Sequence, residues 1–213
     1  MSGLVLHGYW RSTASWRIRI ALALKGIAHE QITHDLRTGE QGDEDYLALN
    51  PQGLVPALVA PGGTFPQSLA ILEWLEESWP VPRLLPEDRT GRARVRAMAD
   101  LICCDIHPLN NLRVLRALRA DFGADDAAIE AWVGGWIGAG FAVLERQIAQ
   151  FGGRFAFGDA PTFADCCLVP QVYAAERFAV DLDPFPAIRR VAADCSDMPS
   201  FRSAHPAHQP DTD

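Results

Sequence analysis

The feature of this sequence that most constrains its fold is the order of the periodic segments before residue 80. Residues 4–9 predict a short strand, and after them apolar side chains recur at helical spacing up to Gly26, which is placed to end a helix. Residues 29–35 alternate between apolar and polar and predict a second strand. A strand, a helix and a strand in this order favour a parallel βαβ unit.

The next segments add an antiparallel hairpin to this unit. Residues 36–45 are polar and contain glycine, so they predict a loop. Strand patterns at 57–59 and 64–65 flank a turn at 61–63, and a helical pattern covers 67–79. A βαβ unit, a hairpin and a covering helix together predict a small mixed sheet.

The rest of the chain has no convincing strand pattern. Prolines and glycine interrupt the periodicity after residue 80, and we place a linker at 83–91 between domains at 1–82 and 92–213. The predicted fold class is an α/β N-terminal domain followed by an all-α C-terminal domain. Helical patterns fill the second domain at residues 92–119, 126–151, 162–178 and 186–194.

Three local signals refine the helical domain. Thr162 is followed three residues later by Asp165, the spacing of a capping box, so Thr162 is predicted to cap its helix. Glycines recur within residues 134–140 inside a helical pattern. Glycine lowers the stability of a helix, and we expect close packing between helices to compensate for this loss. The polar tail from Ser203 onward is expected to be mobile.

Composition excludes several classes of function. Hydrophobic residues make up 48% of the 213 residues and charged residues 22%, which is typical of a soluble globular protein. The net charge of −8 argues against a nucleic-acid-binding surface but allows a local positive pocket for an anionic substrate. The N-terminus lacks the pattern of a secretory signal, and we expect no apolar stretch to approach the ~18 residues that span a bilayer.

The five cysteines predict a reducing compartment. They comprise the adjacent pairs Cys103–Cys104 and Cys166–Cys167 and the single Cys195, an odd number without CxxC spacing. We interpret them as small core residues and expect no metal site. The predicted location is the cytoplasm.

Hydroxyl side chains gather where the first strand meets the first helix. Ser12, Thr13 and Ser15 lie there beside the N–H groups of a helix N-terminus, an environment that stabilises an anion such as a thiolate. The alternative is that one hydroxyl simply caps the helix.

Two further segments have the character of a binding site. Val55–Pro56 stands at a strand entrance, where a cis peptide would expose the backbone N–H and C=O of Val55 to a bound peptide; the alternative is a trans proline that ends a loop. Gln67 and Ser68 open a helix, where an amide, a hydroxyl and the helix dipole suit a ligand carboxylate; here the alternative is a simple cap.

Five segments carry a resemblance to one protein family along nearly the whole chain: SxxSWRIRIALALKG, ALNPQGLVPAL, QSLAILEWLEE, residues 105–113 and FGDAPTFADCCLVPQVY. From residue 4 to 211 the sequence is similar to the zeta class of glutathione transferases, which includes maleylacetoacetate and maleylpyruvate isomerases. The resemblance implies a thioredoxin-like N-terminal domain, an all-helical C-terminal domain, a homodimer and glutathione as cofactor.

The resemblance also implies roles for individual residues. Ser12 matches the serine that faces the glutathione sulfur, and Thr13, Ser15, Trp16 and Arg17 complete that loop. The residues implied to contact or border glutathione are Gln41, Val55, Pro56, Gln67, Ser68, His107, Asn110 and Asn111. The residues implied to bind the substrate carboxylates are Arg11, Arg113 and Arg177.

Structural roles compete with these assignments in the helical domain. His107 precedes Pro108 and is alternatively a partner for a carbonyl that the proline leaves unpaired. Arg113 is alternatively paired with Asp105 or Glu145. Arg177 is alternatively an ordinary surface arginine.

One departure from the family affects the expected chemistry. The family motif commonly reads Ser-Ser-Cys, whereas this chain has Ser12, Thr13 and Ala14. Because this loop has no cysteine, the nucleophile must be the glutathione sulfur.

The activity implied is glutathione-dependent cis–trans isomerisation of a maleyl keto acid, in the catabolism of aromatic compounds, by thiolate addition, rotation and elimination. Guanidinium groups suit the substrate carboxylates. The alternatives are a glutathione transferase or dehalogenase acting on small α-halo acids, and a glutathione-binding dimer without catalysis. The sequence does not choose between maleylacetoacetate and maleylpyruvate.

Overall fold

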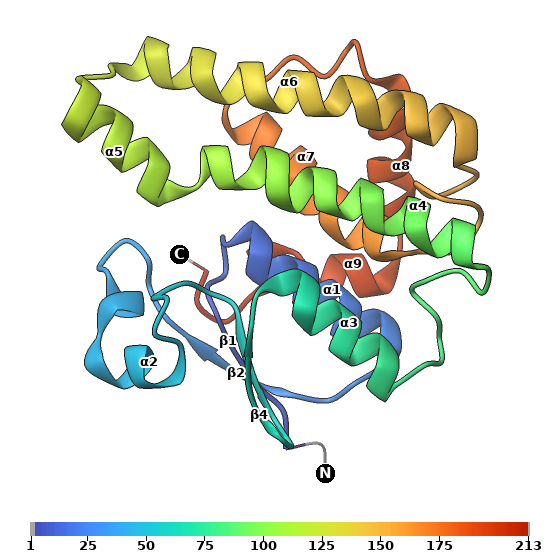
Figure 1. Cartoon of the computed structure of the whole chain (residues 1–213), viewed down its shortest axis with the longest axis horizontal. Helices are drawn as coiled ribbons and strands as arrows, with labels where there is room; N and C mark the ends of the chain where they lie inside the picture. The colour runs from blue at the N-terminus through green and yellow to red at the C-terminus, as the bar shows by residue number, and fades with distance from the viewer. Residues whose placement is uncertain (1–2, 213) are drawn as a thin grey trace. The chain divides into compact units, whose positions relative to one another are not determined.

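The computed structural model describes residues 3–212, and these form two compact units. One unit combines the chain up to Leu84 with the chain from Ser196 onward, and the other runs from Leu85 to Cys195 (Figure 1). The last segment therefore groups with the N-terminal unit, although the sequence-based domain at 92–213 includes it. The domain boundaries at 82 and 92 stay a prediction.

The first unit contains the predicted mixed sheet, with strand order β2-β1-β3-β4. β1 pairs with β2 in parallel, and β3 pairs with both β1 and β4 in antiparallel fashion. This confirms the βαβ unit followed by a hairpin. The strands are β1 (Val5–Gly8), β2 (Glu30–Thr33), β3 (Ala57–Ala60) and β4 (Gly63–Pro66).

Helices cover the sheet on both sides (Figure 1). α1 (Thr13–Lys25), α3 (Ser68–Ser78) and α9 (Pro199–Ala204) lie together on one side, and α2 (Glu44–Leu49) lies on the other. The prediction of a loop at 36–45 was wrong in part, because this segment holds a 3₁₀ turn, Glu40–Gly42, and the start of α2. Both are too short to show a periodic pattern.

The C-terminal tail is folded, which corrects the expectation that it is mobile. α9 packs against α1, and Arg19 Nε of α1 donates to the carbonyl of Ala204 at 3.1 Å. A 3₁₀ turn, Pro206–His208, follows, and the ring of His205 meets the ring of Trp16 edge-on with centroids 5.1 Å apart. The sequence did not predict this docking, because the segment is polar and single residues make its contacts, without a periodic apolar pattern.

The second unit is all-helical within the described residues. The predicted helix at 92–119 is wrong as a single element: the chain forms a π-helical segment and a 3₁₀ turn in its middle. The break falls where Pro108 lacks an N–H for the helical ladder, and Asn111 then caps a new helix. The elements are α4 (Arg89–Asp100), η2 (Leu101–Ile106), η3 (His107–Asn110), α5 (Leu112–Phe122), α6 (Asp126–Phe151), α7 (Phe163–Arg177) and α8 (Pro186–Ser196).

The start of α7 has the predicted capping box. The buried Asp165 carboxylate accepts from the backbone N of Thr162 at 2.8 Å and from that of Ala156 at 2.8 Å. Burial raises the pKa of Asp165 to about 6, against the effect of these hydrogen bonds. The box thus ties the preceding loop to the helix.

The cysteines only partly match their prediction as core residues. Cys166, Cys167 and Cys195 are buried, whereas Cys103 is half-buried and Cys104 is exposed. Cys103 and Cys104 belong to the π-helical η2, which turns part of its surface to solvent. The sequence did not predict that irregularity.

Close packing explains one of the α6 glycines. A Cβ on Gly140 would lie 2.5 Å from Cγ1 of Ile106, so the glycine lets η2 approach α6. At Gly134, Gly135 and Gly138 a Cβ would meet nothing within 4 Å, and nothing in the structure explains them.

α6 is also long and apolar enough to cross a membrane by length and composition, which corrects the expectation that no stretch approaches that length. In the structure its buried residues recur every three or four positions, from Ile129 and Val133 to Leu144 and Ile148. Such a stripe is the pattern of a helix packed on a protein core.

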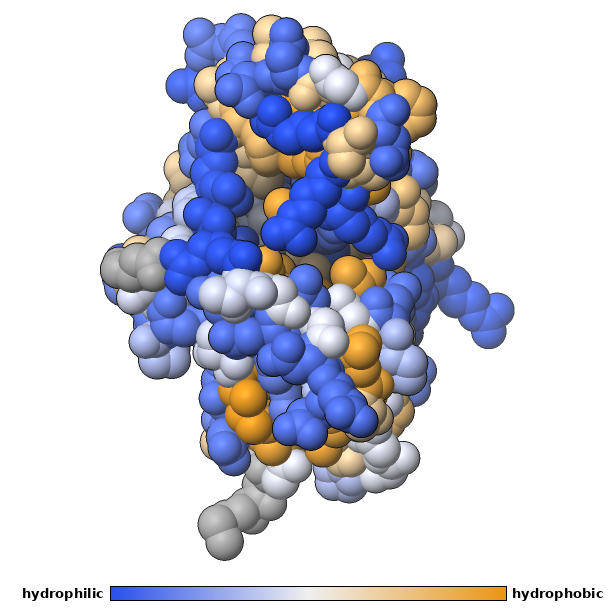
Figure 2. All heavy atoms as spheres, turned by 90° about the vertical axis from the view of Figure 1, so that its left-hand side faces the viewer, coloured by the Kyte–Doolittle hydropathy of each residue, from blue (hydrophilic) through white to orange (hydrophobic). Residues whose placement is uncertain are grey.

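The outer surface shows no large gathering of exposed apolar side chains on the face drawn in Figure 2, where hydrophilic residues predominate and apolar ones are scattered. Single exposed apolar residues are ordinary on soluble domains. Among the described residues the large ones are Ile32, Leu47, Leu49, Val81, Leu112, Phe122 and Trp136.

Candidate functional site

The sheet register brings three of the predicted segments to one end of the first unit. His7 of β1 pairs with Ala57 of β3, which pairs with Pro66 of β4. The chain therefore leaves β1, enters β3 and leaves β4 at the same end of the sheet. The residues that follow or precede these points are 9–15, 54–56 and 67–68, the segments singled out from the sequence.

Ser12 begins α1 and keeps a donor available. Its Oγ accepts from the backbone N of Ser15 at 3.2 Å. Ser12 therefore caps the helix, which is the alternative that the sequence left open. A capping hydroxyl acts as acceptor and still carries its own O–H, which remains able to donate to an anion. Thr13 and Ser15 are buried, and Ser15 Oγ has no hydrogen-bond partner in residues 3–212.

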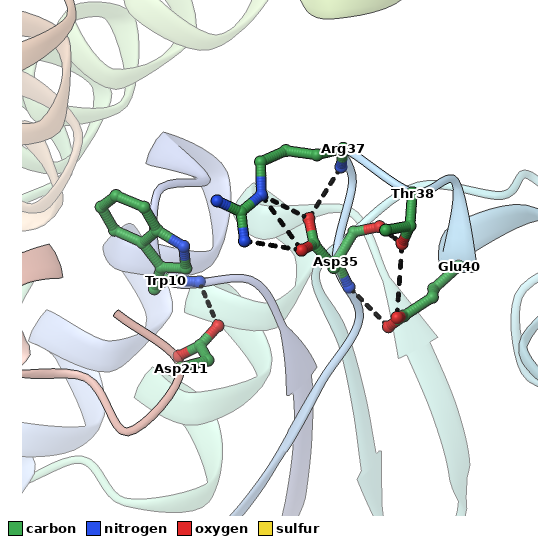
Figure 3. A network of polar contacts seen from close by, with 6 residues as sticks. All are labelled: Trp10, Asp35, Arg37, Thr38, Glu40 and Asp211. Carbon is green, nitrogen blue, oxygen red and sulfur yellow. Dashed lines mark hydrogen bonds and ion pairs between the residues drawn. The ribbon is translucent and has the colours of Figure 1, made fainter. Parts of the chain in front are cut away.

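Two residues that the sequence analysis missed, Arg19 and Asp211, hold the loop before Ser12. The guanidinium of Arg19 donates to the carbonyls of Tyr9 at 3.3 Å and Trp10 at 2.8 Å. From the tail, the Asp211 carboxylate accepts from the Trp10 backbone N at 2.8 Å (Figure 3). Burial lowers the pKa of Arg19 to about 10, and Asp211 opposes that shift. The sequence signal was a pair of arginines, Arg17 and Arg19, that alternate with apolar residues in this helix.

Val55 presents an unpaired backbone at the entrance to β3. The Val55–Pro56 bond is cis, the first of the two alternatives that the sequence left open; the cis bond at Val81–Pro82 was not predicted. The carbonyl of Leu54 accepts from Tyr46 Oη at 2.6 Å and from Asn50 Nδ2 at 2.7 Å. In residues 3–212 no hydrogen bond uses the backbone of Val55.

The start of α3 combines an unusual backbone with a helix N-terminus. Gln67 has φ 70° and ψ 115°, in the half of conformational space that non-glycine residues rarely occupy and that clusters at functional sites. Its side chain makes no capping bond and instead donates to Gln52 Oε1 at 2.8 Å. Ser68 Oγ accepts from Nη1 of Arg17 at 3.1 Å. This end of α3 is arranged to meet an anion.

Gln41 lies in the 3₁₀ turn Glu40–Gly42, whose first residue belongs to a polar network of Asp35, Arg37, Thr38 and Glu40 (Figure 3). Arg37 pairs with the Asp35 carboxylate, and Glu40 accepts from the Asp35 backbone N at 2.7 Å and from Thr38. The hydrogen bonds from Arg37 lower the pKa of Asp35. Gln41 Oε1 is buried without a partner in the described residues, so the network presents an unused polar atom.

In the first unit a further predicted residue, Arg11, is half-buried, and its guanidinium lies over the ring of Trp10, 5.3 Å from the centroid. It follows Trp10 directly and precedes Ser12. The guanidinium is thus attached to the loop that Arg19 and Asp211 hold in place.

The remaining predicted residues belong to the second unit. His107 and Asn110 lie in η3, and Asn110 Nδ2 is buried without a partner within residues 3–212. Asn111 Oδ1 accepts from the backbone N of Arg113 at 3.1 Å, which places Arg113 in the first turn of α5, exposed. Arg177 is the last residue of α7 and is also exposed. Its Cζ lies 6.0 Å from the ring centroid of Tyr173 and 5.9 Å from that of Phe178.

One structural alternative for these residues is not borne out: within the described residues Arg113 forms no ion pair with Asp105 or Glu145. The Glu145 carboxylate instead accepts from the backbone N of Ala187 at 2.7 Å and of Ile188 at 3.0 Å and thereby caps α8. In the neighbouring η3, the carbonyl of Leu109 accepts from Trp132 Nε1 of α6 at 2.7 Å, so this hydrogen bond joins α6 to η3.

Comparison with known proteins agrees with the fold and the sequence motifs. Residues 11–78 match the glutathione S-transferase N-terminal domain, and residues 126–206 match the glutathione S-transferase C-terminal domain. The chain therefore belongs to the glutathione S-transferase family.

Within that family several of the similar proteins are named isomerases. A maleylpyruvate isomerase from Ralstonia sp is 54% identical over 97% of this chain and 99% of that protein. A solved holo maleylpyruvate isomerase, a bacterial zeta-class enzyme, superposes with a TM-score of 0.96 at 53% identity over 98% of this chain and 100% of that chain. A maleylacetoacetate isomerase from Anaeromyxobacter dehalogenans 2CP-1, solved with dicarboxyethyl glutathione and citrate in its active site, is 45% identical with a TM-score of 0.89, over 99% of this chain and 94% of that chain.

Proposed function

We propose that this protein catalyses the glutathione-dependent cis–trans isomerisation of a maleyl keto acid, maleylpyruvate or maleylacetoacetate, to the fumaryl product. The observation that carries the proposal is the convergence at one end of the sheet of a hydroxyl donor at a helix N-terminus, an unpaired Val55 backbone and the N-terminus of α3. These groups suit the thiol, the peptide backbone and a carboxylate of glutathione. The similarity to isomerases supports the reaction type.

When bound, glutathione would supply the thiolate whose reversible addition turns the cis double bond into a single bond, with the electron pair taken up by the conjugated keto group. Rotation about that single bond and elimination of the thiolate would then restore the double bond in its trans form and leave glutathione unchanged. A relative with dicarboxyethyl glutathione in its active site supports this chemistry, since that molecule is a thioether of glutathione and a dicarboxylate. The chain must therefore lower the pKa of a thiol and hold two carboxylates.

Residues of the first unit would perform the first task. Ser12 donates a hydrogen bond to the sulfur, and the N-terminus of α1 with Thr13 and Ser15 favours its ionised form. Because residue 14 is alanine, this loop has no thiol of its own, and the thiol whose pKa these groups lower is that of glutathione. Gln41, Val55, Pro56, Gln67 and Ser68 would bind the rest of glutathione.

Arginines would perform the second task. We assign the substrate carboxylates to Arg11, Arg113 and Arg177, because guanidinium groups bind carboxylates in a bidentate manner. His107, Asn110 and Asn111 are assigned to the border of the glutathione and acceptor sites. The unpartnered Nδ2 of Asn110 supports its place there.

The reaction is tested by following each substrate by proton NMR with and without glutathione. We expect the fumaryl product to appear only with glutathione, while the total glutathione concentration stays constant. Stoichiometric consumption of glutathione would indicate conjugation instead, and the absence of a fumaryl product from both substrates would reject the proposal. The ratio of kcat/KM values would identify the preferred keto acid.

Substitution of Arg177 tests its assignment. In Arg177→Ala we expect the KM for the keto acid to rise about 10-fold or more, the equivalent of a lost charge-assisted hydrogen bond, with glutathione affinity retained. Arg189→Ala, which removes another exposed arginine, serves as the matched control. Equal losses of keto-acid and glutathione affinity in Arg177→Ala would mean that Arg177 has a structural role.

We also propose a cytoplasmic homodimer, in keeping with the class that the chain resembles. Sedimentation equilibrium is expected to give twice the mass of 23.3 kDa. A monomer mass at micromolar concentration would contradict the dimer, and recovery of the protein outside the cytoplasmic fraction of its cell would contradict the location.

A further inference from the structure

Two cysteine sulfurs meet inside the second unit. Cys103 Sγ of η2 donates to Cys167 Sγ of α7 at 3.6 Å, so the two sulfur atoms are in contact. Both residues belong to the unit from Leu85 to Cys195, and none of the five cysteines of the chain forms a disulfide. The pair thus holds two reduced sulfurs next to each other.

The step from this contact to a disulfide is short. A disulfide has an S–S distance of about 2.0 Å, so the two sulfurs have to approach by about 1.6 Å. Rotation of a cysteine side chain together with a small shift of one element supplies such a movement. Cys103 lies in η2, which is π-helical, a rare geometry that is found mostly in short pieces and frequently at functional sites.

The two thiols differ in their access to solvent. Cys103 is half-buried, so a reagent in solution can reach it, whereas Cys167 is buried and can react only with a neighbour inside the protein. This is the arrangement of a redox-sensitive cysteine beside a resolving cysteine. Cys195 is the contrast: burial raises the pKa of its thiol, and its Sγ lies 3.9 Å from a carboxylate oxygen of Asp165 instead of a second sulfur.

We propose that Cys103 and Cys167 are a modification site, at which glutathione disulfide converts the two thiols into an intramolecular disulfide. In the first exchange the Cys103 thiolate attacks one sulfur of glutathione disulfide, forms a mixed disulfide and releases one glutathione thiolate. In the second exchange the Cys167 thiolate attacks the Cys103 sulfur of the mixed disulfide and releases the other glutathione thiolate. Two protein thiols are oxidised, one glutathione disulfide is reduced, and the two thiol protons pass to the two released glutathione molecules.

The new bond would restrain elements that carry residues we assign to the acceptor site. η2 continues directly into η3, which contains His107 and Asn110, and α7 ends at Arg177. η2 also packs on α6, so a movement of Cys103 toward α7 must shift a segment that is held by two helices. We therefore expect oxidation to lower turnover of the keto acid, and this consequence rests on the proposed function.

Peptide mapping by mass spectrometry tests the modification itself. Reduced wild type is incubated with glutathione disulfide, the remaining thiols are alkylated, and the protein is digested without a reductant. We expect a pair of peptides joined by Cys103 and Cys167, lighter by two hydrogens than the two thiol peptides together, which dithiothreitol separates. Cys104→Ser is the matched control, because it removes the exposed neighbouring thiol and should form the same disulfide.

Two variants interrupt the reaction at different steps. Cys167→Ala removes the resolving thiol, and we expect it to stop at the mixed disulfide, with glutathione attached to Cys103. Cys103→Ser removes the thiol that reacts first, and we expect no disulfide between η2 and α7. Because Cys103 is only half-buried, the second variant also covers the case that the change at the buried Cys167 prevents folding.

Initial rates of isomerisation test the consequence. Rates are recorded immediately after glutathione is added, and the disulfide is mapped again at the end of the assay. We expect the oxidised wild type to have a kcat/KM lower on the order of 10-fold, because a displacement of about 1 Å in an active site has effects of this size or larger. Dithiothreitol should restore the rate, and Cys103→Ser should keep its rate through the same treatment.

Other results would overturn the proposal. Absence of the Cys103–Cys167 disulfide, whether all thiols stay reduced or only Cys104 takes up glutathione, would reject the modification site. A disulfide that links two copies of the chain through Cys104 would reject it as well. Formation of the disulfide with an unchanged kcat/KM would reject the effect on the acceptor site. A reduced wild type without isomerase activity would reject the proposed function itself, whereas the peptide map would still decide whether the disulfide forms.

Discussion

At the scale of single residues, a histidine pair is linked through Tyr46 to residues 54–56, the segment that we assign to glutathione binding. His7 Nδ1 and His34 Nε2 are 2.9 Å apart, and the ring of His34 packs on that of Tyr46 with centroids 4.3 Å apart. Tyr46 in turn donates to the carbonyl of Leu54, next to Val55. Burial lowers the pKa of both histidines; the charge of His34 adds to this for His7, whereas Glu30 opposes it for His7 and Glu40 with Asp43 oppose it for His34.

These shifts predict an acid-dependent loss of stability. Because the pKa of each histidine is lower in the folded than in the unfolded protein, the unfolded state binds more protons below pH 6.5. The stabilisation is present above that pH and is lost as the pH falls. We expect His34→Phe, which keeps a ring against Tyr46 but cannot titrate, to show a smaller difference in unfolding free energy between pH 7 and pH 5, measured with urea.

His29→Asn, a change outside the pair, is the control and should leave that difference as in the wild type. A His34→Phe variant with the wild-type pH dependence would mean that other groups cause the acid sensitivity.

At the scale of the elements, the contact between α6 and η2 depends on a missing side chain. Gly140 leaves room for Ile106, the last residue of η2, and η2 leads directly into η3 with His107 and Asn110. The packing of α6 therefore helps to place residues that we assign to the site. A glycine inside a helix is unfavourable by about 1 kcal/mol relative to alanine, and at Gly140 this packing offsets that penalty.

Two alanine substitutions separate packing from helix propensity. Gly140→Ala should destabilise the protein by about 1–3 kcal/mol, because the new methyl group would overlap Ile106. Gly135→Ala, at a position where a Cβ meets nothing within 4 Å, should instead stabilise it by up to about 1 kcal/mol. Urea denaturation measures both, and stabilisation by Gly140→Ala would refute the packing argument.

At the scale of the whole molecule, the N-terminal and C-terminal segments of the described chain belong to one unit. Asp211 binds the backbone of Trp10, and Ala204 binds Arg19, so the C-terminal segment completes the hydrogen bonding of the loop that precedes Ser12. At the other end of α1 a buried ion pair joins this helix to α3, because Lys25 Nζ lies 2.7 Å from Oε2 of Glu76. The placement of α1 thus depends on residues from three distant parts of the chain.

Removal of the Asp211 contact should therefore affect ligand binding from a distance in sequence. We expect Asp211→Ala to weaken glutathione binding by about 3- to 10-fold, the worth of a hydrogen bond, because the Trp10 N–H loses its acceptor and the loop loosens. Asp211→Asn keeps an oxygen acceptor and should bind nearly as the wild type does. Calorimetry distinguishes the two, and unchanged affinity in Asp211→Ala would mean that Arg19 holds the loop unaided.

Prediction from the sequence was accurate where the cause is local. The capping box at Thr162 and Asp165 joins residues three apart, and the 26-residue α6 follows from its own periodicity. The hairpin of β3 and β4 follows from a turn between two short strands. Prediction was wrong at the π-helical η2 and at the docked tail, since both depend on what packs against them.

The sequence by itself determined the mixed sheet, the helical second unit, the family and a set of candidate residues, because these depend on periodicity, capping and motif spacing within short stretches. Only the tertiary structure decided which candidates share one end of the sheet, that Val55 is unpaired, and that the sulfurs of Cys103 and Cys167 lie in contact. The physical reason is that a side chain's hydrogen bonds and burial are set by residues far away in sequence, as Arg17 with Ser68 and Trp10 with Asp211 demonstrate.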